Sequence, residues 1–240
     1  MTPPPRSAMV LAAGLGVRMR PLTDERPKPL MPVAGRPLID HVLDRLVAAG
    51  VRRAAVNLHY KAEMIEQHLA SRNDVEIKFS REDKLLDTGG GVKKALPLLD
   101  EVFFVVNSDV IWLDGKMAAL LRLARAFDPD KRDAQLLMQR TTRAVGYEGP
   151  GDFMLDPAGF LRRRAEREIA PYLFAGIQIL HRRLFDRAPD GAFSLNRLWD
   201  DAIARGRAKA IVHDGEWFHI GTPSGLAATE ARLDTRRIER

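Results

Sequence analysis

Short apolar runs and amphipathic stretches alternate along the chain and divide it into predicted strands and helices. Apolar runs predict strands at 9–11, 53–58, 75–79, 102–106, 134–139, 173–180, 208–212 and 217–220. Apolar residues three or four positions apart predict helices at 37–50, 61–71, 92–99, 116–127, 194–206 and from 222 nearly to the end. Because strand and helix take turns through the first half, the pattern indicates βαβ units and a mostly parallel sheet.

A different texture begins near residue 149. Turn residues at 156–159 lie between two short stretches, 152–155 and 160–163, and this arrangement predicts a β-hairpin. We therefore expect an α/β fold with a Rossmann-like, doubly wound, mixed but mostly parallel sheet, extended by a small antiparallel portion. No linker separates the two parts, so 1–240 is predicted to be one domain with halves at about 8–140 and 141–240.

The most informative stretch follows the first predicted strand. It reads Leu-Ala-Ala-Gly-Leu-Gly-Val-Arg-Met from Leu11, and Pro-Lys-Pro-Leu begins at Pro27. The small residues of this stretch are Ala12, Ala13, Gly14 and Gly16. They let the backbone approach a bulky group. Backbone N–H groups left unpaired in such a loop can surround an anion. Arg18 adds a planar cation and Lys28 a compact one. The stretch therefore predicts a polyphosphate site.

Two other phosphate-binding motifs do not fit these residues. The dinucleotide fingerprint requires a third glycine where Met19 stands, and the P-loop requires Gly-Lys where Met19 and Arg20 stand. A plain tight turn is the remaining structural alternative for the two glycines.

Two later segments are expected to lie near the same site. Asp-Thr-Gly-Gly-Gly at 87–91 precedes the predicted helix 92–99, whose free N–H groups could meet a ligand; a flexible linker is the alternative. Asn-Ser-Asp at 107–109 directly follows the most apolar predicted strand. Ligands of doubly wound sheets bind beyond the carboxyl ends of the strands, although an aspartate there can also be a helix cap.

Together these segments resemble the signature of the sugar-phosphate nucleotidyltransferases, and the resemblance extends from residue 8 to about 230. Within that family the chain is most similar to the N-acetylmuramate-1-phosphate uridylyltransferases of cell-wall (peptidoglycan) recycling, in the segments 87–91, 151–153 and 174–176. The resemblance implies transfer of a uridylyl group from UTP to a sugar-1-phosphate, which gives a UDP-sugar and pyrophosphate. Mannose-1-phosphate guanylyltransferases and glucose-1-phosphate nucleotidyltransferases share the first motif and remain alternatives.

The resemblance also implies a role for each candidate residue. Arg18 would neutralise the departing pyrophosphate, Lys28 would hold the α-phosphate or the sugar phosphate, and Asp109 would bind catalytic Mg²⁺. Nucleotide contacts would come from Leu11, Ala12, Ala13, Gly14, Gly16, Thr88, Gly89, Gly90 and Asn107. Sugar contacts would come from Gly151, Asp152 and Gly176. The glycines at 89–91 would let the base lie against the backbone, so Gly90→Val is expected to weaken UTP binding and to spare the fold.

One position departs from the family pattern. Many relatives carry a second metal-binding aspartate at the end of a late strand, where this chain has His219. Mg²⁺ prefers oxygen ligands, whereas imidazole suits Mn²⁺ and softer ions better. We therefore expect Mg²⁺ on Asp109, phosphates and water, with Mn²⁺ through His219 as the alternative. The altered ligand also leaves open a nucleotide-binding sensor without turnover.

Composition narrows the remaining possibilities. With 240 residues and 45% hydrophobic content, the chain can build a single core, and its lack of cysteine excludes disulfides and thiolate metal sites. The net charge of +6 suits anionic small substrates, and no RNA-binding motif or recognition helix accompanies it. No apolar run approaches the ~20 residues needed to cross a bilayer, and the N-terminal residues lack the apolar core of an export signal. We expect a cytoplasmic monomer or weak homodimer that binds UTP and a sugar-1-phosphate, but neither nucleic acid nor membrane.

Overall fold

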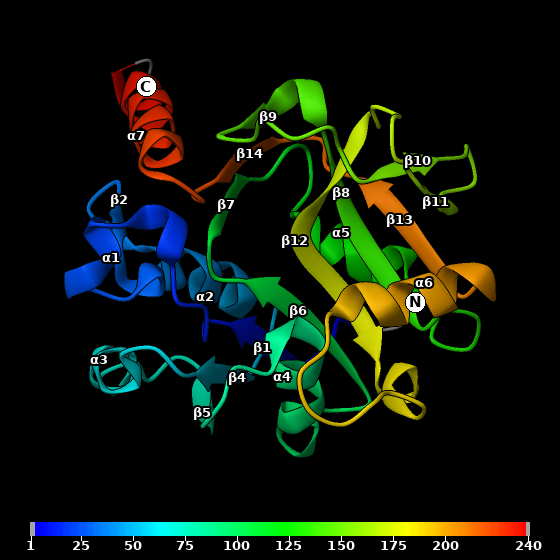
Figure 1. The fold of residues 1–240 in the computed structure, drawn as a ribbon, viewed down its shortest axis with the longest axis horizontal. Coiled ribbons are helices and arrows are strands. Elements are labelled where there is room, and N and C mark those ends of the chain that lie inside the picture. The colour runs from blue at the N-terminus through cyan, green and yellow to red at the C-terminus, as the bar shows by residue number, and fades with distance from the viewer. Residues whose placement is uncertain (1–2, 239–240) are drawn as a thin grey trace.

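The computed structural model describes residues 3–238, and a nine-stranded mixed sheet forms the centre of this part of the chain (Figure 1). The strand order is β11-β10-β12-β6-β1-β4-β5, with β8 paired to the other edge of β12 and β13 paired to β8. These strands are β1 (Ser7–Leu11), β4 (Arg53–Leu58), β5 (Glu76–Arg81), β6 (Val102–Asn107), β8 (Ala134–Arg140), β10 (Phe153–Leu155), β11 (Leu161–Arg163), β12 (Tyr172–His181) and β13 (Ala208–Val212).

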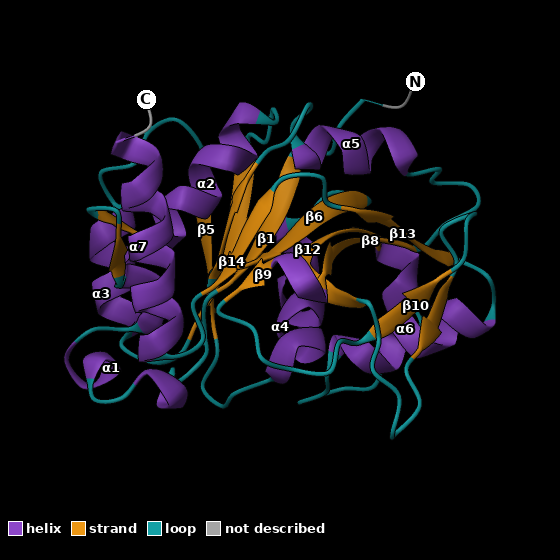
Figure 2. Cartoon of the chain, turned by 90° about the horizontal axis from the view of Figure 1, so that it is seen from above, coloured by secondary structure: helices purple, strands orange, loops and turns teal. Residues whose placement is uncertain are grey.

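Side-chain alternation along the strands builds an apolar core on each face of the sheet. In β1, Val10 faces one cluster, which includes helices α2 (Leu38–Ala48), α3 (Ala62–Leu69) and α5 (Ala119–Ala126). Met9 faces the other cluster, which includes α4 (Asp87–Ala95) and α6 (Leu195–Ala204). Figure 2 shows α2 and α5 on one side of the strands and α4 and α6 on the other. The doubly wound α/β architecture is therefore confirmed.

The strands β5, β4, β1 and β6 run parallel, so their carboxyl ends lie at one edge. Strand β12 is antiparallel to both β6 and β8, and the hairpin β10–β11 continues this antiparallel part. The register of β12 against β8 shifts between Phe174 and Gln178, around Gly176 with its φ of +74°. The second half of the chain thus extends the same sheet as the first.

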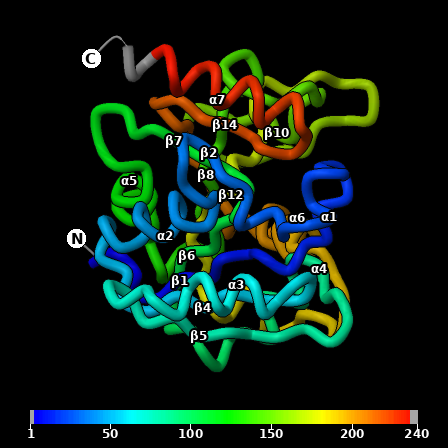
Figure 3. Tube along the Cα trace, turned by 90° about the vertical axis from the view of Figure 1, so that its left-hand side faces the viewer, coloured from blue at the N-terminus to red at the C-terminus, as the bar shows by residue number. Residues whose placement is uncertain are grey.

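A small separate sheet packs beside the C-terminal helix. Strands β7 (Val110–Leu113), β14 (Glu216–His219) and β9 (Ala144–Val145) form a three-stranded sheet, and β2 (Pro32–Val33) pairs with β3 (Arg36–Pro37). Helix α7 (Pro223–Ile238) packs against β14, β9 and β2 and lies next to β14 in Figure 3. A third apolar cluster, which includes Met19, Phe218 and Ile220, joins this layer to the loop after β1.

Short helical segments complete the described chain: α1 (Leu22–Glu25) and 3₁₀ turns at Val17–Met19, Lys28–Leu30, Leu96–Leu98, Thr141–Arg143 and Arg182–Phe185. No helix within residues 3–238 is long and apolar enough to cross a bilayer.

The predicted strands are all present, as is the hairpin at 152–163, with ends that differ by one or two residues at most positions. Strands β2, β3, β7 and β9 escaped prediction: β2, β3 and β9 have only two residues each, and β7 follows the Asn-Ser-Asp segment after β6 almost directly. Helix α5 begins at Ala119, three residues later than expected. The final helix agrees with its prediction as far as residue 238, and 239–240 lie outside the described residues.

The main correction concerns the three glycines at 89–91. Helix α4 begins at Asp87 and contains all three, whereas we expected it to begin after them. The N–H groups of Gly89 and Gly90 donate to the Phe193 carbonyl at 2.8 and 3.1 Å. A Cβ on Gly89 would lie 2.3 Å from the Phe193 ring, and one on Gly90 would lie 2.2 Å from the Gly191 carbonyl oxygen. Close packing on the loop before α6 therefore explains Gly89 and Gly90, whereas a Cβ on Gly91 would lie 2.8 Å from Asn57 Nδ2 and from Glu82 Oε1.

This packing also corrects the expectation that Gly90→Val spares the fold. We predict that even Gly90→Ala lowers the free energy of unfolding by about 1–3 kcal/mol, because the methyl group would force the 191–193 loop away from α4. Alanine is the better helix former, so a neutral or stabilising result in chemical denaturation would contradict the packing explanation. Gly14→Ala is the matched control, since a Cβ at Gly14 would have no atom within 4 Å.

Candidate active site

A cavity of about 510 Å³ opens where β1, β4 and β6 end. The strand ends are neighbours, because Leu11 of β1 pairs in register with Asn57 of β4 and with Asn107 of β6. All three residues line the cavity. Its volume is within the usual range for small-molecule and cofactor sites. The parallel part of the sheet thus places the loop after β1 at the position expected for a ligand.

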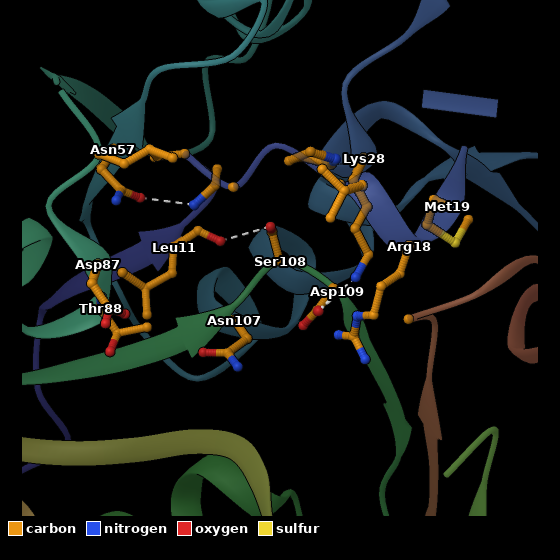
Figure 4. Close-up of a pocket in the computed structure, with 18 of the residues that line it drawn as sticks. Leu11, Arg18, Met19, Lys28, Asn57, Asp87, Thr88, Asn107, Ser108 and Asp109 are labelled. Carbon is orange, nitrogen blue, oxygen red and sulfur yellow. Dashed lines mark hydrogen bonds and ion pairs between the residues drawn. The ribbon is translucent and has the colours of Figure 1, made fainter. Parts of the chain in front are cut away.

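Hydrogen bonds hold the loop after β1 in place. The Ala12 N–H donates to Asn57 Oδ1 at 2.7 Å, and the Ser108 hydroxyl donates to the Leu11 carbonyl at 2.7 Å (Figure 4). Within residues 3–238, none of the N–H groups at positions 13–16 donates to a protein acceptor. Gly16 has a φ of +64° and its Cβ position is 3.0 Å from the Thr23 methyl group, so a side chain there would be strained. These free N–H groups can together surround an anion.

Two cations and a carboxylate gather at one end of the cavity. Lys28 Nζ donates to Asp109 Oδ2 at 2.7 Å, and their side chains are only 12% and 24% exposed. Pro27 and Pro29 flank Lys28 and restrict its backbone. Arg18 lines the same end, and its guanidinium forms no hydrogen bond or ion pair with another described residue (Figure 4). Arg18 is therefore available for an added anion.

The charges at this end shift the pKa values of two groups. Burial raises the pKa of the Asp109 carboxyl, but attraction to Lys28, His219 and Arg18 outweighs it and holds the pKa below its ordinary value. Burial lowers the pKa of His219, and repulsion by Lys28 and Arg18 adds to that effect, against attraction by Asp109. Asp109 is therefore ionised and His219 neutral at pH 7.

His219 lies at the end of β14, beside the Lys28–Asp109 pair. Its Nε2 is 3.9 Å from Asp109 Oδ2. The ring stacks on Trp217 with centroids 5.9 Å apart, and Gly221 leaves room for it because a Cβ there would lie 2.6 Å from the ring. The Ile220 N–H donates to the Asp109 carbonyl and joins β14 to the end of β6. The small sheet thus brings His219 to Asp109, the two positions that the family resemblance relates to each other.

The other end of the cavity contains a buried carboxylate that sequence reasoning missed. Glu82 is 5% exposed, and its Oε1 accepts from Asn57 Nδ2 at 2.7 Å while its Oε2 accepts from the Leu86 N–H at 3.0 Å. Asp87 and Thr88 lie at this same end (Figure 4). Glu82 directly follows β5 and Asn57 lies near the end of β4, and neither belongs to a sequence motif that would single it out. Their pairing depends on the contact between β4 and β5.

A second cavity, of about 270 Å³, adjoins the first and shares four of its lining residues, Leu11, Asp87, Thr88 and Asn107. Its other walls come from β10, β11, β12 and α6. Asp152 lines it and is held in place, because its Oδ2 accepts from the Phe174 N–H at 2.8 Å. The two cavities together could hold a nucleotide and a second, smaller group.

Ten of the predicted residues line the first cavity: Leu11, Ala12, Ala13, Gly14, Gly16, Arg18, Lys28, Thr88, Asn107 and Asp109. Four predicted glycines line neither cavity: Gly89, Gly90, Gly151 and Gly176. Gly89 and Gly90 were expected to contact the nucleotide, but they instead allow α4 to pack closely on the loop before α6. A Cβ on Gly151 would lie 2.2 Å from the Ala170 carbonyl oxygen, and one on Gly176 would lie 3.2 Å from Asn107 Cβ. These glycines shape the walls through backbone packing.

Within the described residues, no group of three or more His, Cys, Asp or Glu side chains could hold a metal ion by itself. Asp109 is the carboxylate at the cationic end of the cavity, and Lys28 already neutralises it. This donor set suits an ion such as Mg²⁺, which commonly takes one carboxylate together with substrate phosphates and water.

Comparison with known proteins adds three findings. A family model described as nucleotidyl transferase matches residues 7–147. The N-acetylmuramate alpha-1-phosphate uridylyltransferase of Caulobacter vibrioides is 46% identical over 239 residues, which cover 97% of this chain and 99% of the relative. The mannose-1-phosphate guanylyltransferase of Mycobacterium tuberculosis is 32% identical, over 94% of this chain and 64% of the relative.

Solved structures agree with the fold. The inositol-1-phosphate CTP transferase from T. maritima superposes with a TM-score of 0.80 over 98% of this chain and 97% of that one, at 19% identity. At 19% identity, this structural similarity supports the fold assignment alone. The parallel strand ends, the glycine loop and the two cations beside Asp109 agree with both sequence matches. Because the family model covers more than half of the chain and the Caulobacter relative nearly all of it, the chain belongs to the nucleotidyl transferase family.

Proposed function

We propose that this protein transfers a uridylyl group from UTP to N-acetylmuramic acid α-1-phosphate and forms a UDP-sugar and pyrophosphate. The observation that carries the proposal is the 46% identity to the Caulobacter uridylyltransferase across nearly the full length of both chains. The guanylyltransferase relative is less similar and longer than this chain, which makes it the weaker candidate. We also propose a cytoplasmic location and a monomer or weak homodimer.

In this proposal the triphosphate lies at the cationic end of the first cavity. The free N–H groups at 13–16 surround its oxygens, Arg18 neutralises the departing pyrophosphate, and Lys28 holds the α-phosphate or the sugar phosphate. A sugar phosphate oxygen attacks the α-phosphorus from the side opposite the leaving pyrophosphate. Such transfers depend mainly on alignment and charge stabilisation.

No side chain has to act as a general base in this reaction, because a phosphate monoester is already anionic near pH 7. The attacking phosphate oxygen therefore carries no proton that the neutral His219 would have to remove. Asp109 would hold Mg²⁺ together with phosphate oxygens, and the ion would supply additional positive charge when bound. Lys28 must then share Asp109 with the ion or move toward the phosphates.

The proposed reaction can be tested with purified protein by measuring pyrophosphate release. The assay pairs UTP, GTP and ATP with the 1-phosphates of N-acetylmuramic acid, N-acetylglucosamine, glucose and mannose. We expect UTP with N-acetylmuramic acid 1-phosphate to give the highest kcat/KM. Faster turnover of GTP with mannose 1-phosphate would replace this proposal with the guanylyltransferase alternative. Nucleotide binding without turnover in any pair would favour a sensor.

We predict that Arg18→Ala and Lys28→Ala each reduce kcat/KM by about 100-fold or more, because each removes a charge-assisted contact that strengthens in the transition state. Arg18 is exposed and makes no contact that folding requires, so its variant should unfold like wild type. Lys28→Ala should also lose some stability, because Asp109 would lose its partner. Arg20→Ala is the control: Arg20 is exposed, pairs with Asp24 and lies outside the cavity. Near-normal turnover by Arg18→Ala would remove it from the mechanism.

We further predict that calorimetry detects little Mg²⁺ binding before nucleotide is added, because Lys28 occupies Asp109.

Asp109→Asn should abolish turnover, whereas His219→Asp should be tolerated and should tighten Mg²⁺ binding by adding a carboxylate. Activity is measured against Mg²⁺ and Mn²⁺ concentration for wild type and both variants. A wild type active only with Mn²⁺ would instead assign the ion to His219.

A further inference from the structure

The second cavity contains a buried amide whose hydrogen bonding is incomplete. Gln178 is 1% exposed, and its Oε1 accepts from Trp199 Nε1 at 2.9 Å. Because the indole N–H can only donate, the amide must turn its oxygen toward Trp199. Gln178 Nε2 is then left without a partner among the described residues. A buried donor of this kind is normally satisfied, so the cavity is suited to a ligand with an oxygen acceptor.

Arg163 is the one cationic side chain among the residues that line this cavity. It projects from β11, and its guanidinium carbon lies 4.5 Å from the Phe153 ring centroid and 5.9 Å from that of Trp199. Its Nε donates to Asp200 Oδ1 at 2.7 Å and its Nη2 to Asn196 Oδ1 at 2.9 Å. These contacts fix the plane of the guanidinium, and Nη1 forms no hydrogen bond within residues 3–238.

The ion pair with Asp200 does not remove Arg163 from use by a ligand. The Asp200 side chain is 56% exposed, so solvent screens the pair. The other carboxylates at the cavity are Asp152, whose Oδ2 accepts from the Phe174 N–H, and Asp87 at the junction with the first cavity. A fixed guanidinium with free N–H groups is well suited to a carboxylate, which it can bind through two hydrogen bonds.

The arrangement of the two cavities fixes which part of a substrate reaches Arg163. The phosphate-binding end, with Arg18 and Lys28, belongs to the first cavity alone. A sugar-1-phosphate that places its phosphate there extends its ring past the shared residues into the second cavity. Ring substituents then face Arg163 and Gln178. An uncharged N-acetyl sugar gives a cation no partner there, whereas N-acetylmuramic acid carries a carboxylate on its lactyl ether.

We propose that Arg163 selects an acidic sugar by binding the lactyl carboxylate, while Gln178 Nε2 donates to an oxygen of the same sugar. The inference rests on the proposed function and adds the residue that sets its sugar specificity. Arg163 would then contact the substrate at a point remote from the reacting phosphates. Its loss should therefore change the preference between sugars more than it changes the chemistry.

The test compares Arg163→Leu and Arg163→Lys with wild type on two substrates. N-acetylmuramic acid 1-phosphate and N-acetylglucosamine 1-phosphate differ only in the lactyl ether, and UTP is kept saturating. For Arg163→Leu we expect kcat/KM to fall about 10- to 100-fold on the acidic sugar, mainly through KM, with no fall on the uncharged one. Arg163→Lys should recover part of the preference. The ratio between substrates is independent of the folded fraction of each preparation.

Arg162→Leu is the matched control, because Arg162 neighbours Arg163 on β11 but is exposed, pairs with Glu168 and lies outside the cavity. Equal losses on both sugars in Arg163→Leu would overturn the inference and leave the proposed function intact. If wild type instead used another acidic sugar, such as glucuronic acid 1-phosphate, with the same dependence on Arg163, the proposed function and the lactyl contact would both fail, and only the selection of an acidic sugar by Arg163 would stand. A preference for an uncharged sugar that Arg163→Leu does not change would overturn both.

Discussion

The ion pair between Lys28 and Asp109 joins the two segments on which the site depends. Lys28 belongs to the stretch after β1, and Asp109 follows β6, so the pair connects regions 81 residues apart at the edge of the sheet. Both side chains are largely shielded, and a charge in such a place is costly without a partner. The ligand-free protein meets that requirement internally. An arriving polyphosphate offers Lys28 new oxygens and exposes Asp109 to a cation, so substrate and metal binding are expected to assist each other.

The same pair explains why a small second sheet matters to the site. The Ile220 N–H ties β14 to the Asp109 carbonyl, and the cluster around Met19 and Phe218 ties that sheet to the loop after β1. His219 is thereby confined beside Asp109, stacked on Trp217. Its burial keeps it neutral, so it adds no charge to the pair at pH 7. Within residues 3–238, Asp109 is thus the one carboxylate that lines this end of the cavity, where the resemblance led us to compare His219 with a second aspartate.

The sequence was sufficient for the parts that local patterns encode. The apolar run at 9–11 predicted the buried strand β1, and Gly14, Gly16 and Arg18 predicted the loop that lines the first cavity, because each feature depends on neighbours along the chain. Contacts between distant segments could not be read in this way. Glu82 meets Asn57 only because β4 and β5 pair. Arg163 differs from Arg162 only through the register of β11, which turns one toward the cavity and the other toward solvent.

The glycines of α4 connect the packing of the fold to the site. By omitting side chains, Gly89 and Gly90 let the first turns of α4 touch the loop before α6. This contact also brings Thr88 against α6, where its Oγ1 accepts from the Leu195 N–H at 3.0 Å. Thr88 is one of the four residues that line both cavities. Gly89 and Gly90 were expected to touch the base directly, but they line neither cavity, and their close packing instead sets the position of the wall that the two cavities share.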